Sequence, residues 1–269
     1  MKPLFRPFVA FDAGIGSYAV VDMIRRRYPR QDVLYVADRA SFPYGSKGAA
    51  ELLGSVQRVV DAALAVEPSV ILVASNAPTV MVFEQLTVPS AVALRGVFPP
   101  IRESLRASKS KQVVVMGVKS LTDSPAFQKF VAVEQAAVGA LQARIEGVNA
   151  SSMVELVESA VFLSDPERAQ AQVSQFIANT RQQWPQADVY TLSSTHLPWL
   201  RSFFERAAPE LRFLDPAQAV VDSLESLTTA GSGRLETWVT DNPRYPVEEF
   251  AAMLQRLRLD IPYSVRHLQ

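Results

Sequence analysis

Two short polar segments of the chain contain residues that could do chemistry, and each directly follows an apolar run. The first is Ala74–Pro78, with the sequence ASNAP, and the second is Ser193–Pro198, with the sequence SSTHLP. Ligands of open α/β sheets bind beyond the carboxyl ends of strands, so both segments could line a site. A serine hydroxyl is a weak nucleophile and base unless a neighbouring group such as a histidine activates it, which makes Ser194 a candidate catalytic residue and His196 its candidate activator.

The histidine at position 196 allows two interpretations. It lies two residues after Ser194, so the two side chains form one candidate pair, with Glu158 as a third group that would orient the imidazole. Consecutive loop residues often point apart, and a histidine is also kept for structural reasons alone. Glu158 has a similar alternative, because it falls in an amphipathic helical pattern in which solvated glutamates are common.

Two turn-like segments also follow predicted strands. Asp12–Ser17 contains Gly14 and Gly16, one glycine fewer than a dinucleotide-binding fingerprint, and its aspartate would repel a pyrophosphate. This segment therefore favours a small-ligand loop or a plain strand–helix turn over a nucleotide site. In the second segment Tyr44 and Gly45 follow a proline, and they either contact a substrate or form an ordinary turn.

The composition is that of a folded globular protein and excludes several function classes. Of 269 residues, 48% are hydrophobic and 20% are charged, and 27 basic residues balance 27 acidic ones. This balance argues against a nucleic-acid binder that relies on a broad basic face. The chain contains no cysteine, which excludes disulfides, thiolate metal sites and thiol nucleophiles.

The remaining residue patterns give no sign of a metal, a cofactor or a membrane partner. No cluster of histidine, aspartate and glutamate has metal-ligand spacing, so we expect no metal, and the two-glycine loop argues against a dinucleotide cofactor. Apolar runs such as Val70–Ala74 are too short to span a bilayer, and prolines and an arginine interrupt the first seven residues. These features predict a cytoplasmic protein.

Short apolar runs alternate with longer amphipathic ones along the chain. The predicted strands are Phe8–Asp12, Asp32–Ala37, Ser69–Ala74, Ser90–Ala93, Gln112–Gly117, Ala187–Leu192 and Glu210–Leu214. The predicted helices are Ser17–Tyr28, Ala49–Ala65 and Pro166–Gln183. Alternation of buried strands with helices predicts an α/β fold with mainly parallel sheets.

Taken in order, four motifs resemble those of the glutamate racemases, within the wider aspartate/glutamate racemase family. The motifs are Asp12-x-Gly14-x-Gly16, Asp38 followed by Pro43-Tyr44-Gly45, Ala74-Ser75-Asn76, and Thr195-His196-x-Pro198. The resemblance implies two pseudo-symmetric α/β domains, 1–98 plus 214–269 and 99–213, with the site in the interdomain cleft. It also implies cofactor-independent chemistry on an amino acid and leaves a homodimer open.

The resemblance further implies roles for individual residues. In that family two cysteines flank the substrate, and their positions correspond here to Ser75 and Ser194, which are far weaker acids than thiols. Asp12, His196 and Glu158 correspond to residues that orient groups or assist proton transfer. The implied substrate-binding residues are Tyr44, Gly45, Asn76, Thr79 and Thr195. Other motif positions also differ from the family pattern, at Ala13, Ala77 and Leu197.

Two functional hypotheses follow, and a third has no positive feature. In the first, the protein binds an acidic amino acid or a related dicarboxylate and lacks two-thiol racemase activity. In the second, it is an active isomerase, racemase, lyase or hydrolase that uses Ser75, Ser194 and His196, because a degenerate site would drift to alanine or glycine more readily than to serine. The third hypothesis is an interaction protein with an empty site.

Overall fold

The computed structural model describes residues 3–268, which fall into two compact units. Unit 1 comprises 3–97 and 217–268 and therefore contains both ends of the described chain, whereas unit 2 is the continuous segment Phe98–Pro216. Each unit contains one sheet of parallel strands with helices packed on it, so the expected α/β fold class is confirmed.

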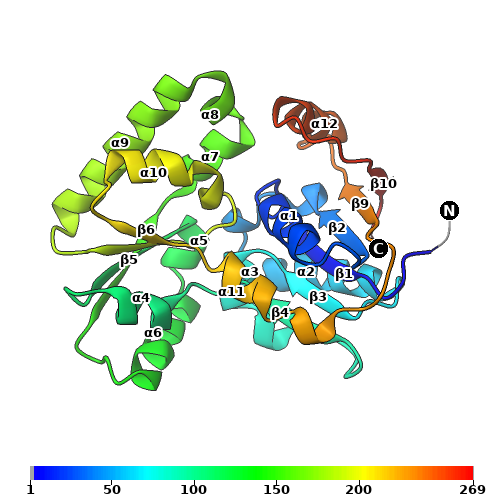
Figure 1. Cartoon of the computed structure of the whole chain (residues 1–269), viewed down its shortest axis with the longest axis horizontal. Helices are drawn as coiled ribbons and strands as arrows, with labels where there is room; N and C mark the ends of the chain where they lie inside the picture. The colour runs from blue at the N-terminus through cyan, green and yellow to red at the C-terminus, as the bar shows by residue number, and fades with distance from the viewer. Residues whose placement is uncertain (1–2, 269) are drawn as a thin grey trace. The chain divides into compact units, whose positions relative to one another are not determined.

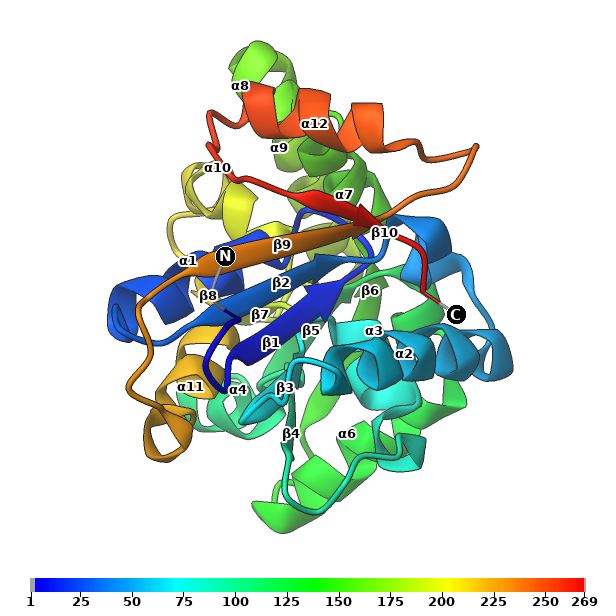
Figure 2. The same ribbon diagram turned by 90° about the vertical axis from the view of Figure 1, so that its right-hand side faces the viewer.

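The sheet of unit 1 has six strands in the order β10-β9-β2-β1-β3-β4, which Figure 2 shows side by side. The strands are β1 (Phe8–Asp12), β2 (Val33–Ala37), β3 (Val70–Val73), β4 (Ala93–Gly96), β9 (Leu235–Thr240) and β10 (Ser264–Arg266). The α-helices are α1 (Tyr18–Arg27), α2 (Ala49–Leu64), α3 (Asn76–Met81), α11 (Ala217–Asp222) and α12 (Val247–Arg256). The short 3-10 helices are η1 (Arg39–Ser41), η2 (Tyr44–Ser46), η3 (Phe83–Gln85) and η5 (Glu225–Leu227).

The sheet of unit 2 has four strands in the order β6-β5-β7-β8. The strands are β5 (Gln112–Gly117), β6 (Arg144–Asn149), β7 (Val189–Leu192) and β8 (Arg212–Leu214). The helices are α4 (Ile101–Ala107), α5 (Lys119–Thr122), α6 (Pro125–Ala137), α7 (Ser151–Glu158), α8 (Val161–Ser164), α9 (Pro166–Gln183), η4 (Leu197–Leu200) and α10 (Arg201–Ala207). Helices α4 and α6 cover one face of this sheet, and α9 and α10 cover the other (Figure 1).

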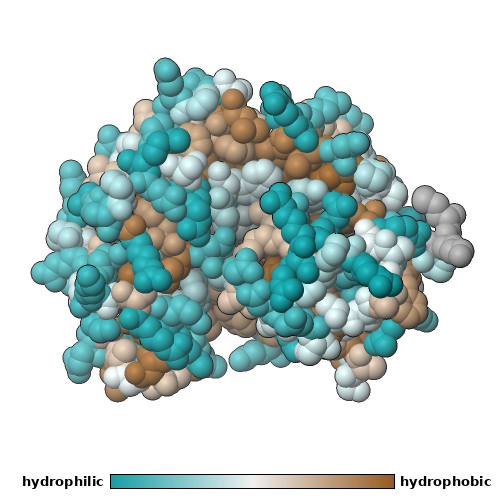
Figure 3. All heavy atoms as spheres, viewed as in Figure 1, coloured by the Kyte–Doolittle hydropathy of each residue, from teal (hydrophilic) through white to brown (hydrophobic). Residues whose placement is uncertain are grey.

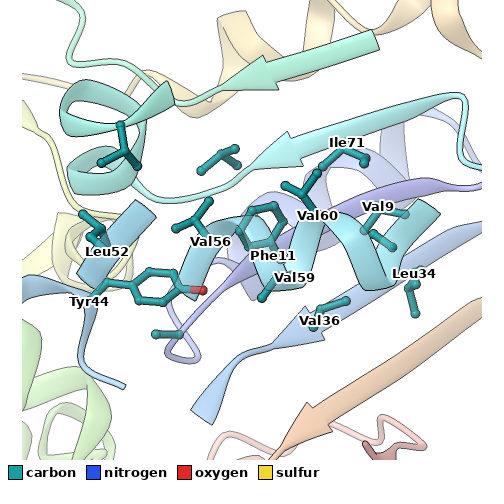
Figure 4. Packing of buried hydrophobic residues seen from close by; sticks show 14 of the residues in the cluster. Val9, Phe11, Leu34, Val36, Tyr44, Leu52, Val56, Val59, Val60 and Ile71 are labelled. Carbon is teal, nitrogen blue, oxygen red and sulfur yellow. The ribbon is translucent and has the colours of Figure 1, made fainter. Parts of the chain in front are cut away.

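The core of unit 1 forms where α2 lies on the sheet. Every residue of β1 and β2 is buried, as expected for parallel strands covered on both faces. Figure 4 shows the apolar side of α2 over these strands, with packed side chains from Val9, Phe11, Leu34, Val36, Leu52, Val56, Val59, Val60 and Ile71. Burying one such side chain stabilises the fold by about 1.5–3 kcal/mol, so this cluster holds the strand ends in register.

The helix with the clearest boundaries in the sequence is α9. Its N-cap Asp165 accepts a hydrogen bond from the Arg168 amide at 3.0 Å, and Pro166 occupies the first turn, where a missing N–H costs nothing. The apolar positions Ala169, Val173 and Ile177 are buried at helical spacing. The prediction of a helix over Pro166–Gln183 is confirmed at both ends.

The predicted strand Ser90–Ala93 is wrong in its position along the chain. A turn closed by the Val92 amide on the Pro89 carbonyl at 2.9 Å holds this part of the chain, and β4 runs over Ala93–Gly96 instead. Strand β4 lies at the edge of the sheet and is only half-buried, so its sequence lacks an apolar run that would mark it.

The face of the molecule seen in Figure 3 carries many hydrophilic residues with hydrophobic residues between them.

Candidate functional site

The polar residues of unit 1 meet where two neighbouring strands end. Strand β1 pairs with β2 on one side and β3 on the other, so the chain reverses its direction across the sheet at β1. Ligands of open α/β sheets bind beyond the carboxyl ends of the strands at such a switch point. Asp12 is the last residue of β1, and Ser75 follows β3 by two residues. We refer to Asp12, Ser75, Asn76 and Thr79 as the unit 1 cluster.

Asn76 is the member of the unit 1 cluster with an unused polar atom. Its amide Nδ2 donates to the Val97 carbonyl at 2.9 Å, which fixes the orientation of the side chain. The amide oxygen Oδ1 is then buried and has no hydrogen-bond partner among the described residues. Leaving a buried acceptor unsatisfied costs about 1–3 kcal/mol, so this atom is suited to an N–H or O–H donor of a ligand.

The other members of the cluster are positioned by backbone contacts. Asp12 is buried, and its Oδ1 accepts a hydrogen bond from the Ala13 amide at 2.7 Å. Ser75 is the N-cap residue of α3, and its side chain makes no capping hydrogen bond. The Thr79 hydroxyl donates to the Ser75 carbonyl at 2.7 Å, so its proton is used within the helix rather than offered to a ligand.

Tyr44 and Gly45 lie in η2, within the turn that follows β2. The Tyr44 hydroxyl donates to Asp38 Oδ2 at 2.9 Å, and the Thr240 hydroxyl donates to Asp38 Oδ1 at 2.7 Å. Burial raises the pKa of the Tyr44 phenol well above its usual value, and the neighbouring Asp38 charge acts in the same direction. Tyr44 is therefore a protonated donor whose hydrogen is held by Asp38, while its ring packs beside Leu52 (Figure 4).

Sequence reasoning missed the role of Asp38 and Thr240 in holding Tyr44. A signal for Asp38 was available, because a carboxylate directly after a buried strand stands at the same edge of the sheet as Asp12. The backbone confirms this, since the Asp38 amide donates to the Asp12 carbonyl at 2.8 Å. No comparable signal marked Thr240, which is 202 residues away from its partner.

The polar residues of unit 2 form a second cluster, consisting of Glu158, Ser194, Thr195 and His196. His196 Nε2 lies 2.6 Å from Glu158 Oε1, and both side chains are largely buried. Helix α7 carries Glu158 in its last position, and His196 precedes η4. Since the carboxylate can only accept, Nε2 carries the proton in this pair, and the remaining nitrogen Nδ1 is left as the acceptor when the ring is neutral.

The structure brings His196 together with Glu158 but does not hydrogen-bond it to Ser194. Within residues 3–268 no side-chain hydrogen bond joins Ser194 and His196. The hydroxyl that is engaged belongs to the preceding residue, as Ser193 Oγ lies 2.7 Å from Thr191 Oγ1. Ser194 and Thr195 are both buried after the end of β7.

Ser75 and Ser194 occupy the same position in their two sheets. In unit 1 the Ala74 amide donates to the Phe11 carbonyl at 2.9 Å, and in unit 2 the Ser193 amide donates to the Met116 carbonyl at 2.9 Å. Each candidate serine is the next residue along the chain. The two polar segments therefore have equivalent places in the fold. Each follows the third strand of a four-strand order that both sheets share, β3 in unit 1 and β7 in unit 2.

The described residues contain no group of three or more histidine, aspartate or glutamate side chains that could hold a metal ion. Among the helices of residues 3–268, none is long and apolar enough to cross a bilayer. The side chains of the two clusters supply carboxylates, hydroxyls, one amide and one imidazole.

Comparison with known proteins gives a consistent result. The chain is 25% identical to the glutamate racemase of Herpetosiphon aurantiacus over 264 residues, which cover 95% of this chain and 99% of that protein. It is 27% identical to the glutamate racemase of Aquifex aeolicus over 233 residues, covering 86% and 87% of the two chains. No protein-family model matches the chain.

Solved structures agree with these sequence matches. A glutamate racemase isoform from Bacillus anthracis superposes with a TM-score of 0.81 at 19% identity, covering 97% of each chain. The glutamate racemase of Thermus thermophilus, solved in complex with β-chloro-D-alanine, gives a TM-score of 0.78 at 25% identity and covers 100% of this chain and 98% of that one. The length of these alignments, the shared fold and the ordered strand-end motifs support the resemblance to the aspartate/glutamate racemase family.

Proposed function

We propose that this protein binds an acidic amino acid or a related small dicarboxylate and lacks two-thiol racemase activity. The observation that carries the proposal is that a chain without cysteine has serine at the equivalent strand-end position of both sheets. The ordinary pKa of a cysteine thiol is about 8.5, so a thiolate is accessible near neutral pH, whereas an alkyl hydroxyl has no such form. Neither serine can therefore supply the thiolate base of a two-thiol racemase.

The binding part of the proposal is supported by the polar groups that remain. The buried Oδ1 of Asn76 is an unused acceptor for a ligand ammonium, and the hydroxyls of Ser75, Ser194 and Thr195 stand at strand ends. Similar structures were solved with glutamate bound: the Francisella tularensis glutamate racemase with D-glutamate, and the Escherichia coli enzyme with L-glutamate and an activator. We propose the same ligand class here.

A second candidate function is an active cofactor-independent isomerase, racemase, lyase or hydrolase. The observation that favours it is the buried His196–Glu158 pair at 2.6 Å. In this pair Glu158 would hold the imidazole ring in one orientation and one tautomer, which leaves Nδ1 able to accept a proton. The catalytic residues would be His196 with Ser194, after a side-chain rotation that brings them together, and Ser75 with Asp12 in the unit 1 cluster.

One experiment separates the two functions. The purified protein is incubated with D- and L-glutamate, D- and L-aspartate and succinate in deuterated water, and NMR follows α-proton exchange while thermal shift follows binding. Our proposal expects a raised melting temperature with at least one acidic ligand and no exchange. Exchange of an α-proton would refute the binding-only function and support the isomerase, and no thermal shift with any ligand would refute the binding site.

Cellular location and assembly form a minor part of the proposal. We place the protein in the cytoplasm, where free acidic amino acids are available to it, and subcellular fractionation tests this. The family resemblance leaves a homodimer open, and light scattering of the purified chain decides between monomer and dimer.

A further inference from the structure

A small cavity in unit 1 lies outside the two clusters. It has a volume of about 190 Å³ and is lined by the carboxyl ends of β2, β9 and β10 and by one turn of α2. Its lining residues are Asp38, Ala40, Ser41, Ser55, Arg58, Thr240, Asp241, Arg266, His267 and Leu268. Cavities that take drug-sized molecules are typically about 300–1,000 Å³, so this one suits a small ion or a single charged group.

Two arginines line this cavity without an ion-pair partner. Neither the Arg58 nor the Arg266 guanidinium lies within 4.0 Å of a carboxylate among the described residues. Arg58 makes only a long contact to Ser55 Oγ at 3.4 Å, and the Arg266 guanidinium lies 5.3 Å from the centre of the Trp238 ring. Stacking on an aromatic face fixes a guanidinium and leaves its N–H edge free to bind an anion.

The two carboxylates of the lining are already used inside the protein. Both oxygens of Asp38 accept hydrogen bonds, from the Tyr44 and Thr240 hydroxyls. Asp241 Oδ1 accepts from the Val247 amide at 2.8 Å. The lining groups that can donate a hydrogen bond to an anion are the two guanidinium forks, the Ser41 and Ser55 hydroxyls and His267.

We propose that this cavity binds a small oxyanion, a phosphate or carboxylate group, through Arg58 and Arg266. Planar guanidinium forks match the oxygen spacing of these groups and bind them by charge-assisted hydrogen bonds. The proposal does not depend on the amino-acid site, because none of the unit 1 cluster residues lines this cavity. The competing explanation is that the arginines only offset the charges of Asp38 and Asp241 through space.

Calorimetric titration of inorganic phosphate and of succinate tests the proposal. Both titrations are made at constant ionic strength in a buffer that supplies no competing oxyanion. We expect one saturable site for at least one of them. Arg58→Gln and Arg266→Gln should each raise Kd about tenfold, as expected for the loss of a charge-assisted hydrogen bond. The matched control Arg256→Gln removes an equally exposed charge of α12 that does not line the cavity, and it should leave Kd unchanged.

An opposite substitution sharpens the test. Asp241→Asn keeps an oxygen for the Val247 amide but removes a negative charge from the lining, so the anion should bind several-fold more tightly. Ser75→Ala distinguishes succinate binding in the cavity from binding at the amino-acid site. A succinate signal that Ser75→Ala abolishes and Arg58→Gln leaves intact belongs to the amino-acid site. The proposal would be overturned if neither phosphate nor succinate showed saturable binding. It would also be overturned if Arg256→Gln raised Kd as much as the cavity variants do, or if Asp241→Asn lowered Kd for neither anion.

Discussion

The two units use the same four-strand arrangement but place their acidic groups differently. Strand order β2-β1-β3-β4 in unit 1 corresponds to β6-β5-β7-β8 in unit 2. The Asp38 amide donates to the Asp12 carbonyl, and at the equivalent place the Ala150 amide donates to the Gly117 carbonyl at 2.7 Å. The two strand-end carboxylates of unit 1 thus correspond to alanine and glycine in unit 2.

Unit 2 obtains its carboxylate from a helix instead. Glu158 comes from the end of α7 and meets His196 ahead of η4. The strand order therefore fixes where a site can form, while the identity of the reactive groups depends on residues added to that framework. The serine position is the part that the two units share.

The largest effect is expected for two carboxylates that hold segments of their units together, the buried Asp32 and the half-buried Asp188. Asp32 accepts hydrogen bonds from the amides of Phe5, Ser232 and Arg234, which belong to two distant segments. Asp188 accepts hydrogen bonds from one segment of three consecutive residues, Ser108, Lys109 and Ser110. We expect Asp32→Ala to lower the free energy of unfolding by about 3 kcal/mol and Asp188→Ala by about 2 kcal/mol, because Asp32 joins more distant segments.

Urea unfolding measures both values, and the exposed Asp61→Ala serves as the control, with an expected change below about 0.5 kcal/mol. A loss for Asp188→Ala equal to or larger than that for Asp32→Ala would contradict the proposed difference between the units.

The same two carboxylates should make stability depend on pH. Burial alone would raise the pKa of Asp32 and of Asp188, but the hydrogen bonds that they accept outweigh burial and lower both pKa values. A lowered folded-state pKa stabilises the protein above the unfolded value of about 3.9, and this contribution is lost as pH falls through the folded value.

The free energy of unfolding of the native protein, measured with urea, should therefore fall as the pH is lowered below about 4. Asp32→Asn and Asp188→Asn should each flatten that dependence. An unchanged slope in both variants would show that other groups carry the acid sensitivity.

A smaller effect is expected on ligand binding, and it tests each cluster separately for a role in binding an acidic ligand. Asn76→Ala in unit 1 and His196→Asn in unit 2 should each weaken acidic amino-acid binding by about tenfold, equivalent to about 1.4 kcal/mol. Thr79→Val should change the affinity less than about twofold, because its hydroxyl already donates to the Ser75 carbonyl. Titration calorimetry provides the affinities, and an effect confined to one unit would show that the other cluster does not contact the ligand.

The smallest signal is expected from restoring thiols at the two equivalent positions. Ser75→Cys combined with Ser194→Cys should produce slow but detectable α-proton exchange with glutamate, since a thiolate is accessible near neutral pH. Each single variant should show less exchange than the pair, because a two-base reaction needs an acid and a base. If the double variant binds glutamate and exchanges nothing, the surrounding residues Ala13, Ala77 and Leu197 become the next positions to change.

The sequence predicted the fold best where one physical signal dominated. Strand Gln112–Gly117 is an uninterrupted apolar run, and α9 has an aspartate cap and a proline, so both were placed correctly at each end. Strands β6, β9 and β10 were not predicted, because charged and polar residues interrupt them. Their strand conformation depends on pairing partners elsewhere in the chain, which local patterns do not show.

For the candidate site, the motifs predicted a set of residues but not the contacts between them. Glu158 and His196 are 38 residues apart, and their pairing was one of two interpretations of the sequence. A Ser194–His196 hydrogen bond, one of the two interpretations of the histidine, is absent among the described residues, and the Thr79 hydroxyl is used within its own helix. Rotamer choice and the local backbone decide such contacts, and neither can be read from residue types.

The discontinuous composition of unit 1 has a consequence for synthesis on the ribosome. Strand β9, which pairs with β2 over residues 235–239, leaves the ribosome about 200 residues after its partner, when all of unit 2 has already been made. Until then the edge of β2 has no neighbour on that side, and an unpaired strand edge is a site for aggregation. A nascent chain halted before residue 235 should therefore contain a foldable unit 2 and an incomplete unit 1 that needs protection by a chaperone.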